Sequence, residues 1–133
     1  MKKMILVAAL FSVSNVFAAS MDCKLDIFNP GGKHESLTLT LKQEGDAERG
    51  SVVTAGGISA GVFKVDAKNQ KTLSMWLGKK IPNDPLNSYL NIGGIERNSL
   101  LPKGEEMVLK TSTMDKINGF DMETPIFLTC TGK

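Results

Sequence analysis

Aromatic and imidazole side chains are scarce in this chain. Its 133 residues include one Trp, one Tyr, six Phe and one His. The single histidine, His34, sits beside a turn, and no Ser or Cys is arranged around it as a catalytic nucleophile would be. We therefore interpret His34 as a solvated loop residue and predict no catalytic residue.

Helical periodicity is also missing, as are internal repeats and low-complexity tracts. Apolar and polar residues instead alternate in short runs separated by turn residues, which is typical of antiparallel strands. These runs span residues 21–28, 36–42, 51–54, 58–65, 71–78, 86–92, 106–112 and 125–131. We predict one all-β domain over residues 19–133, a small antiparallel β-barrel or barrel-like sandwich of about seven to eight strands.

Some parts of this pattern carry more specific expectations. A change of phase beside Gly61 predicts a β-bulge or a sharp bend there. Leu86, Leu90 and Ile92 alternate with polar residues, so we expect all three to face the core. Residues 45–50, 93–104 and 113–124 are predicted as loops, the last with one helical turn around residues 114–117.

The longest apolar run lies at the start, from Met4 to Val13, and is too short to span a membrane. Lys2 and Lys3 precede it, and Val16-Phe17-Ala18 follows it as a small-x-Ala cleavage site. We predict that residues 1–18 are a bacterial Sec-type signal peptide cleaved after Ala18. The mature chain is then expected in the periplasm or the medium, without a membrane span.

Excess charge of one sign is absent from the predicted mature chain. The full sequence has 16 Lys and Arg against 14 Asp and Glu, and removing Lys2 and Lys3 makes the two counts equal. No basic run is longer than Lys79-Lys80. A neutral chain with mixed signs lacks the basic surface that nucleic acids and anionic lipids require, so we expect neither as a partner.

Only two cysteines are present, Cys23 and Cys130, and both remain after the predicted cleavage. In an exported chain such a pair is typical of one disulfide. Each cysteine shares the apolar phase of its own run, which predicts that the N- and C-terminal strands pair and are linked by this bond. A bond that closes a loop of roughly one hundred residues stabilises the fold by roughly 4–5 kcal/mol in the chain-entropy model.

Metal and acid–base sites have weak support in the sequence. Asp121 and Glu123 resemble the carboxylate pair of a glycosidase, but we interpret them, and Glu105-Glu106, as solvated loop charge. Calcium ligands along residues 115–123 do not match the EF-hand spacing. Met107, Met114 and Met122 are soft ligands for copper(I), although packing is the better interpretation. We predict no metal and no cofactor.

The outward phase of the strands contains the best candidates for binding. Trp76 alternates with hydroxyl residues and Tyr89 with amide residues, a combination that suits contact with a protein or a glycan. The predicted long loops add Leu100, Leu101 and Phe120. The competing interpretation is that the loop with Leu100 and Leu101 folds back over the aromatic residues.

These features favour an exported binding module without catalytic activity, with a protein or glycan partner in the cell envelope. The layout resembles the small periplasmic lysozyme-inhibitor barrels, which also combine compact β-structure with disulfide closure. That resemblance implies inhibition of a cell-wall hydrolase by a loop, here residues 93–104 or 113–124, that enters the catalytic cleft. A carrier of a small hydrophobic ligand is the alternative, and an enzyme that acts on envelope material through Asp121 or Glu123 is a third.

Overall fold

The computed structural model describes residues 20–133. The predicted signal peptide and its cleavage site lie outside the described residues. Within the described range the chain forms nine strands. They are β1 (Met21–Phe28), β2 (His34–Leu39), β3 (Lys42–Glu44), β4 (Ala47–Val53), β5 (Ile58–Ala67), β6 (Gln70–Lys80), β7 (Tyr89–Arg97), β8 (Glu106–Ile117) and β9 (Phe120–Gly132).

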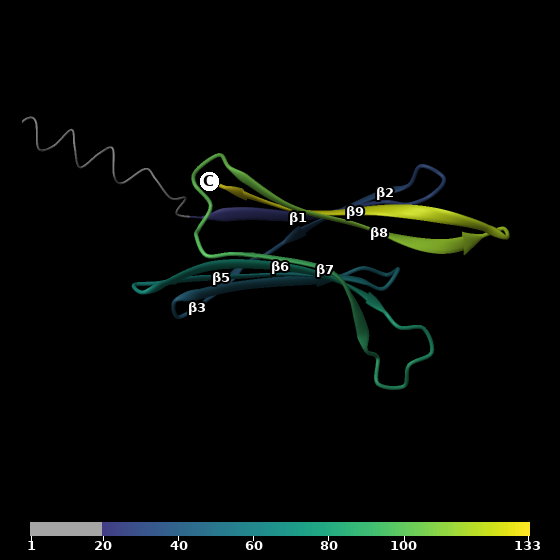
Figure 1. Cartoon of the computed structure of the whole chain (residues 1–133), viewed down its shortest axis with the longest axis horizontal. Coiled ribbons are helices and arrows are strands. Elements are labelled where there is room, and N and C mark those ends of the chain that lie inside the picture. The colour runs from purple at the N-terminus through teal and green to yellow at the C-terminus, as the bar shows by residue number, and fades with distance from the viewer. Residues whose placement is uncertain (1–19) are drawn as a thin grey trace, which may run out of the picture.

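The strands form two antiparallel sheets, ordered β2-β1-β9-β8 and β3-β4-β5-β6-β7, which lie as two layers in Figure 1. Each strand reverses the direction of the one before it, except that β3 continues in the direction of β2, so the turns fall at two ends of the molecule. We call the end with turns 29–33, 54–57, 81–88 and 118–119 the distal end. The described termini meet at the opposite, terminal end, where the Lys133 N–H donates to the Ser20 carbonyl at 2.9 Å. The all-β antiparallel prediction is confirmed.

The terminal strands pair as predicted. β1 runs antiparallel to β9, and Cys23 lies directly opposite Cys130. The two sulfur atoms are bonded at 2.03 Å, and both residues are almost fully buried. The bond therefore joins the two ends of the described chain inside the core, in the centre of the four-stranded sheet.

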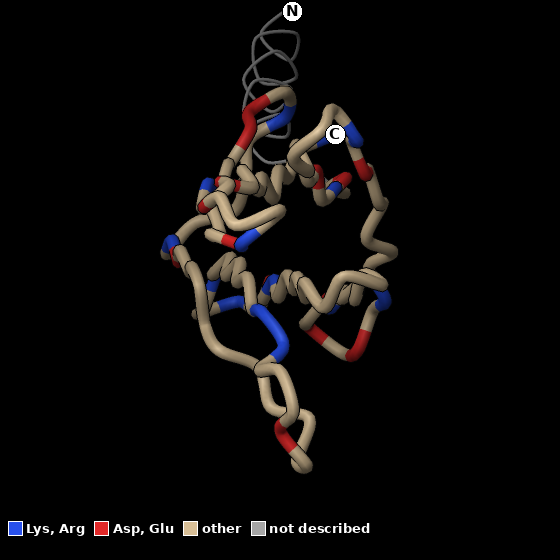
Figure 2. Tube along the Cα trace, turned by 90° about the vertical axis from the view of Figure 1, so that its right-hand side faces the viewer, with Lys and Arg blue, Asp and Glu red and all other residues tan. Residues whose placement is uncertain are grey.

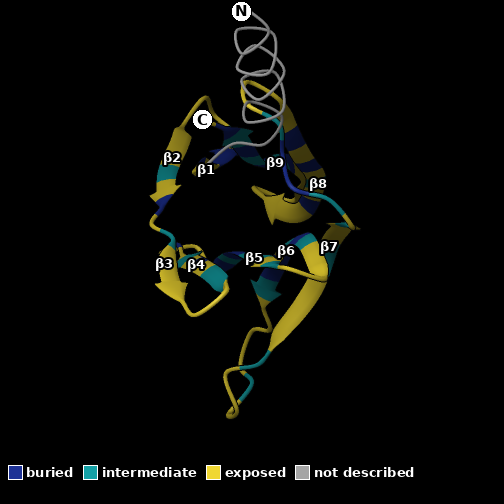
Figure 3. Ribbon diagram, turned by 90° about the vertical axis from the view of Figure 1, so that its left-hand side faces the viewer, coloured by how far each residue is buried: buried dark blue, intermediate teal, exposed yellow. Residues whose placement is uncertain are grey.

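The core fills the space between the two sheets. Alternate residues of β1 and β9 point into it, and so do alternate residues of β5 and β6, which gives the banded burial pattern in Figure 3. The most buried large side chains are Leu25, Val62, Leu73, Met75, Leu77, Ile126 and Leu128. At the terminal end Leu101 joins this core, and the Lys64 ammonium reaches Glu48 at 3.3 Å.

The region predicted as a loop over residues 113–124 is a β-hairpin instead. β8 continues to Ile117, β9 begins at Phe120, and no helical turn forms between them. Asn118 and Gly119 have φ values of 53° and 83°, as a two-residue type I′ turn requires. Asn-Gly is a strong hairpin signal, and the sequence interpretation missed it because the residues around it alternate weakly.

Two other predicted loops are partly strands. Residues 47–50 belong to β4, where they pair with β3 and β5, and residues 93–97 belong to β7, where they pair with β6. The predicted strand 36–42 is divided between β2 and β3, because residues 40–41 carry the chain from one sheet to the other. The local sequence of these glycine-rich and charged segments does not indicate a strand. They form strands because neighbouring strands supply their hydrogen bonds.

The burial expected for Leu86 and Leu90 is wrong, whereas Ile92 packs against the core as expected. Leu86 is 83% exposed in the loop before β7, and Leu90 is 60% exposed on that strand. Asn83 and Asn87 have positive φ values, which turn the chain repeatedly and delay the start of the strand until Tyr89.

The bulge expected at Gly61 is also wrong, because β5 keeps a regular register with β4 and β6. The register shift lies at Leu77/Gly78 in the pairing of β6 with β7. The apparent change of phase arises because Lys64 continues the buried face of β5 while Phe63 lies on the outer face.

Candidate functional site

Exposed apolar side chains gather at the distal end. They are carried by the ends of strands and by the turns there, whereas the charged residues of both signs are spread over the whole molecule (Figure 2). The exposed large apolar residues of this end are Phe28, Val53, Ile81, Leu86, Tyr89, Leu90, Met114, Ile117, Phe120 and Met122. Such a concentration is uncommon on a surface that contacts only water.

The most prominent part of this end is the hairpin formed by residues 113–124, which we call the hairpin arm. β1 pairs with β9 only from residue 126 onward, so the arm extends beyond its neighbour strand (Figure 1). Phe120, at the tip, is 72% exposed. The arm is thus a two-stranded ribbon whose apolar tip stands clear of the sheet.

The two faces of the arm differ in chemistry. Directly paired residues share a face of an antiparallel ribbon, so Ile117 with Phe120 and Asp115 with Met122 continue the core-facing side. On the outer side, Lys116 pairs with Asp121, and Met114 with Glu123. At the base of the arm, the Lys79 ammonium of β6 binds the Asp115 carboxylate at 2.7 Å.

The mouth between the sheets at the distal end is nearly closed. A hollow of about 100 Å³ remains there, with Thr113 and Thr124 on one side and Ile58 and Lys79 on the other. Pockets for small molecules usually have several times this volume.

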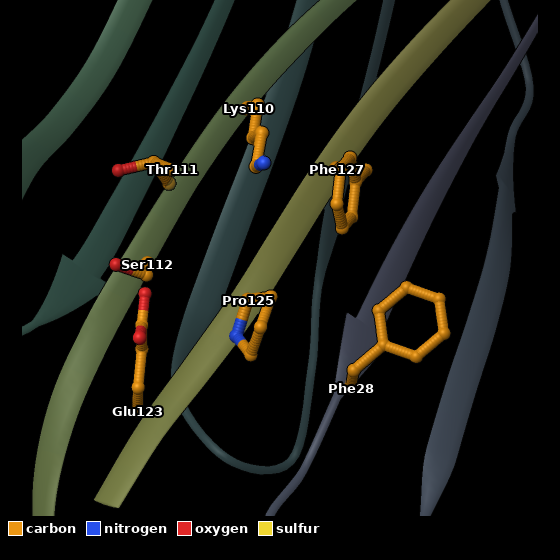
Figure 4. Close-up of a pocket in the computed structure, with 7 residues that line it drawn as sticks. All are labelled: Phe28, Lys110, Thr111, Ser112, Glu123, Pro125 and Phe127. Atoms are coloured by element: carbon orange, nitrogen blue, oxygen red, sulfur yellow. The ribbon is translucent and has the colours of Figure 1, made fainter.

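A larger, shallow hollow lies on the outer face of the four-stranded sheet (Figure 4). Its volume is about 640 Å³, and we call it the outer hollow. Its lining consists of Phe28, Lys110, Thr111, Ser112, Glu123, Pro125 and Phe127. In the close-up, Glu123 points toward Ser112, and Pro125 lies between Glu123 and the two phenylalanines. The Lys110 ammonium lies 5.6 Å from the centre of the Phe127 ring.

His34 is solvent-exposed, as expected, but it lies in β2 on this outer face and not in a loop, which corrects the sequence interpretation. It begins β2 opposite Phe28, on whose ring it stacks with 4.4 Å between centroids. Its Nε2 atom lies 2.9 Å from Asp26 Oδ1. Burial raises the pKa of Asp26. Hydrogen bonds from His34 and Ser36 and the charge of Lys24 together lower it by a larger amount, so the pKa of Asp26 in the folded protein lies below its ordinary value.

Trp76 and Tyr89 both lie on the outer face of the five-stranded sheet, as their phases predicted. Trp76 covers Gly61 on β5, and Tyr89 lies beside Gly78 on β6. Both remain partly exposed. They are separate from Phe120, so the structure does not unite the predicted contact residues in one site.

Leu100 and Leu101 have a different place from the one expected. They are 4% and 3% exposed, because the connection between β7 and β8 folds over the terminal end of the core. In this position they close the core and present no surface to a partner. They do not cover Trp76 or Tyr89, which stay accessible.

The candidate ligands for metals do not converge. Met107 is in the core, whereas Met114 and Met122 occupy opposite faces of the arm. Asp115 likewise faces away from Asp121 and Glu123. No group of three or more His, Cys, Asp or Glu side chains within residues 20–133 is placed to hold a metal ion.

Comparisons with known proteins found no matching family model, no similar curated protein and no similar solved structure. In the described part of the chain, no helix is long and apolar enough to cross a membrane.

Proposed function

We propose that this chain is an exported, non-catalytic binding protein that engages a protein partner in the cell envelope through its hairpin arm. The observation that carries the proposal is the exposure of Phe120 and Ile117 at the tip of a ribbon that projects beyond the sheet. Aromatic residues on such positions are frequent anchors of protein interfaces. The exposed loop 81–88 at the same end adds Ile81 and Leu86 to the contact surface.

The support of the arm favours this use. β8 and β9 stay in register from the base of the sheet to the tip, and the Cys23–Cys130 bond anchors β9 to β1. An arm held in one conformation loses little conformational entropy on binding. A narrow, apolar tip of this kind suits a cleft, so inhibition of a cell-wall hydrolase is the specific version of the function that we propose.

The cellular context completes the proposal. The disulfide is compatible with an oxidising compartment, and we propose the periplasm or the medium, reached through the signal peptide predicted in residues 1–18. We further propose that the two sheets act as one barrel-like sandwich. The Thr111 hydroxyl of β8 donates to the Ile92 carbonyl of β7 at 2.9 Å, which links the sheets along one side.

The other functions have less support. A carrier of a hydrophobic ligand needs interior space, whereas the large side chains between the sheets are fully buried and the hollow at the mouth has a volume of only about 100 Å³. An enzyme that uses Asp121 or Glu123 needs a substrate cleft around these carboxyl groups. Both side chains are exposed on the projecting arm.

The test places a benzophenone amino acid at Phe120 in cells that carry the native envelope, with the same residue at Val108 as control. Val108 is also exposed and lies on β8, toward the terminal end. We expect light-dependent coupling from position 120 to one envelope protein and none from position 108. Equal coupling from both positions, or none from position 120, contradicts the proposal.

The inhibitor version has its own assay. Release of labelled peptidoglycan fragments by lysozyme-type hydrolases is measured with the native chain, with Ile117→Ser/Phe120→Ser, and with Val108→Ser. We expect inhibition by the native chain and by Val108→Ser, and a loss of inhibition of about a hundredfold in the double variant. Full inhibition by the double variant excludes the arm.

A further inference from the structure

One side of the hairpin arm is an unpaired strand edge. The register between β1 and β9 ends at Ile27 opposite Ile126, while β9 itself begins at Phe120. Residues 120–124 therefore pair with β8 on one side only. Among residues 20–133, no strand lies along their other side, which we call the open edge.

Two hydrogen bonds near the C-terminus show which backbone groups point to the open edge. The Gly132 N–H donates to the Glu105 carbonyl on the β8 side, and the Lys133 N–H donates to the Ser20 carbonyl on the β1 side. Backbone groups alternate sides along a strand, and the β8–β9 register is regular over its whole length. The odd-numbered residues of β9 thus face the β1 side, so Asp121 and Glu123 present their N–H and C=O groups to the open edge.

Pro125 marks the inner limit of this edge. It is also odd-numbered and has no N–H, and it stands at the position where pairing with β1 stops. Beyond it, toward the tip, nothing in the chain's covalent structure prevents a further strand from pairing. Short edges of this type accept extended peptides in many recognition domains.

The side chains along the open edge specify what such a strand should contain. Asp121 and Glu123 lie on the outer face, and Phe120 and Met122 on the core-facing side. Lys116 lies opposite Asp121 and partly balances its charge, but Glu123 faces Met114 and has no cation across the ribbon. A strand that alternates basic and apolar residues matches both faces.

A second copy of this chain is a poor occupant. Antiparallel pairing of two open edges about Met122 places Asp121 of each copy opposite Glu123 of the other. Like charges directly opposite each other destabilise a strand pair. The partner is therefore a different protein with a basic segment.

The outer hollow is continuous with the open edge. Glu123 and Pro125 line it, and Phe28, the last residue of β1, lies on its other side (Figure 4). A strand on the open edge is in line with β1, so a long basic side chain on its outer face extends into the hollow. There an arginine contacts the Glu123 carboxylate and the aromatic rings. The Lys110 ammonium already lies over Phe127, and its charge disfavours a second cation deeper in the hollow.

We propose that the open edge of the hairpin arm binds one extended segment of a partner protein as an added β-strand, with alternating basic and apolar residues and an arginine in the outer hollow. This inference rests on the proposed function, since it names the chemistry of the partner at the same arm.

The test uses the mature, oxidised chain and a capped Arg-Val-Arg-Val-Arg peptide, followed by NMR hydrogen exchange. We expect the amides of Asp121 and Glu123 to gain protection, while that of Met122, which already faces β8, does not change. A Glu-Val-Glu-Val-Glu peptide should bind at least about tenfold more weakly, and Asp121→Lys/Glu123→Lys should reverse the preference.

Backbone methylation separates strand pairing from simple charge attraction. One peptide is methylated at the backbone nitrogens of its arginines, and a second peptide at those of its valines. Each modification blocks only one of the two hydrogen-bonding edges of the peptide. We expect one methylated peptide to bind as the parent does and the other to lose about tenfold or more in affinity. Equal binding of the two, unchanged exchange at Asp121 and Glu123, or no binding at millimolar peptide overturns the inference. Coupling from position 120 in the envelope experiment tests the proposed function independently, so the two failures are distinguishable.

Discussion

The contact between Gly61 and Trp76 predicts that Gly61→Ala destabilises the native protein but stabilises a variant that lacks the Trp76 ring. Gly61 of β5 lies opposite Trp76 of β6, and a methyl group added at Gly61 would be 1.9 Å from a carbon of the indole ring. Gly61 does not have a positive φ, so alanine suits the backbone there. The nearest obstacle to Gly61→Ala is therefore the ring.

The structure sets the size of the effect. Trp76 is 39% exposed, so about three-fifths of its surface is in contact with the protein. An aromatic side chain covers roughly 150–250 Å² when buried, so displacement exposes about 100–150 Å² and costs about 2.5–4 kcal/mol at about 25 cal/mol per Å². The ring can tilt and recover part of that contact. We expect Gly61→Ala to lower the free energy of unfolding by about 2 kcal/mol.

In the Trp76→Ala background the same substitution should stabilise the protein. The obstacle is gone, and alanine is about 0.5–1 kcal/mol better than glycine within a strand because it restricts the unfolded chain. Urea unfolding followed by far-UV circular dichroism measures all four proteins with the disulfide intact. The fluorescence of Trp76, the single tryptophan, should also shift to longer wavelength in Gly61→Ala.

The refuting result is equally clear. If Gly61→Ala destabilises both backgrounds equally, the effect comes from the backbone or from β4, and the indole does not rest on Gly61. If it has no effect in either background, the sheet absorbs the methyl group without moving the ring.

Three further predictions concern covalent, electrostatic and turn contributions. Replacing both Cys23 and Cys130 with alanine should lower the free energy of unfolding by up to about 4.7 kcal/mol, measured in urea, because the bond spans 107 residues; reduction of the native protein should reproduce the loss, and an unchanged midpoint contradicts it. The pKa of Asp26 is lowered in the folded state, so its contribution is complete above the unfolded value of about 4 and is lost as the pH falls through the folded pKa. Asp26→Asn should therefore flatten the stability profile between about pH 5 and pH 2, and a profile as steep as that of the native protein would show that other carboxylates dominate. Gly119→Ala should cost about 1–2 kcal/mol through its φ of 83° alone, since no atom lies near the added methyl group; a Gly56→Ala control, at a glycine without positive φ, should cost less.

The strands of the core were predictable because their alternation is strong. Leu25, Leu73 and Leu128 each stand in clear period-two runs, and all three are fully buried. The pairing of the terminal strands was also predictable, since Cys23 and Cys130 occupy the apolar phase of their runs. The prediction failed for the hairpin arm and for residues 93–97 of β7, where exposed apolar residues and glycines make the alternation ambiguous.

The candidate site was less predictable than the fold. Phe120 was identified only as a residue of a loop, although Asn118-Gly119 was a readable sign of the hairpin that presents it. Leu100 and Leu101 were expected at the surface because a local pattern does not reveal that a connection folds over the core. The contact of His34 with Asp26 and Phe28 depends on the register between β1 and β2, and register is a property of two strands and not of one.

The sequence by itself determined the antiparallel β-class, the pairing of the terminal strands and the disulfide between them, because alternation and cysteine placement act along one strand at a time. The tertiary structure alone decided the division into two sheets and the projection of the arm beyond β1. It also decided which backbone groups of Asp121 and Glu123 face the open edge. These features depend on where strands distant in sequence stop pairing, and that is set by packing between the sheets.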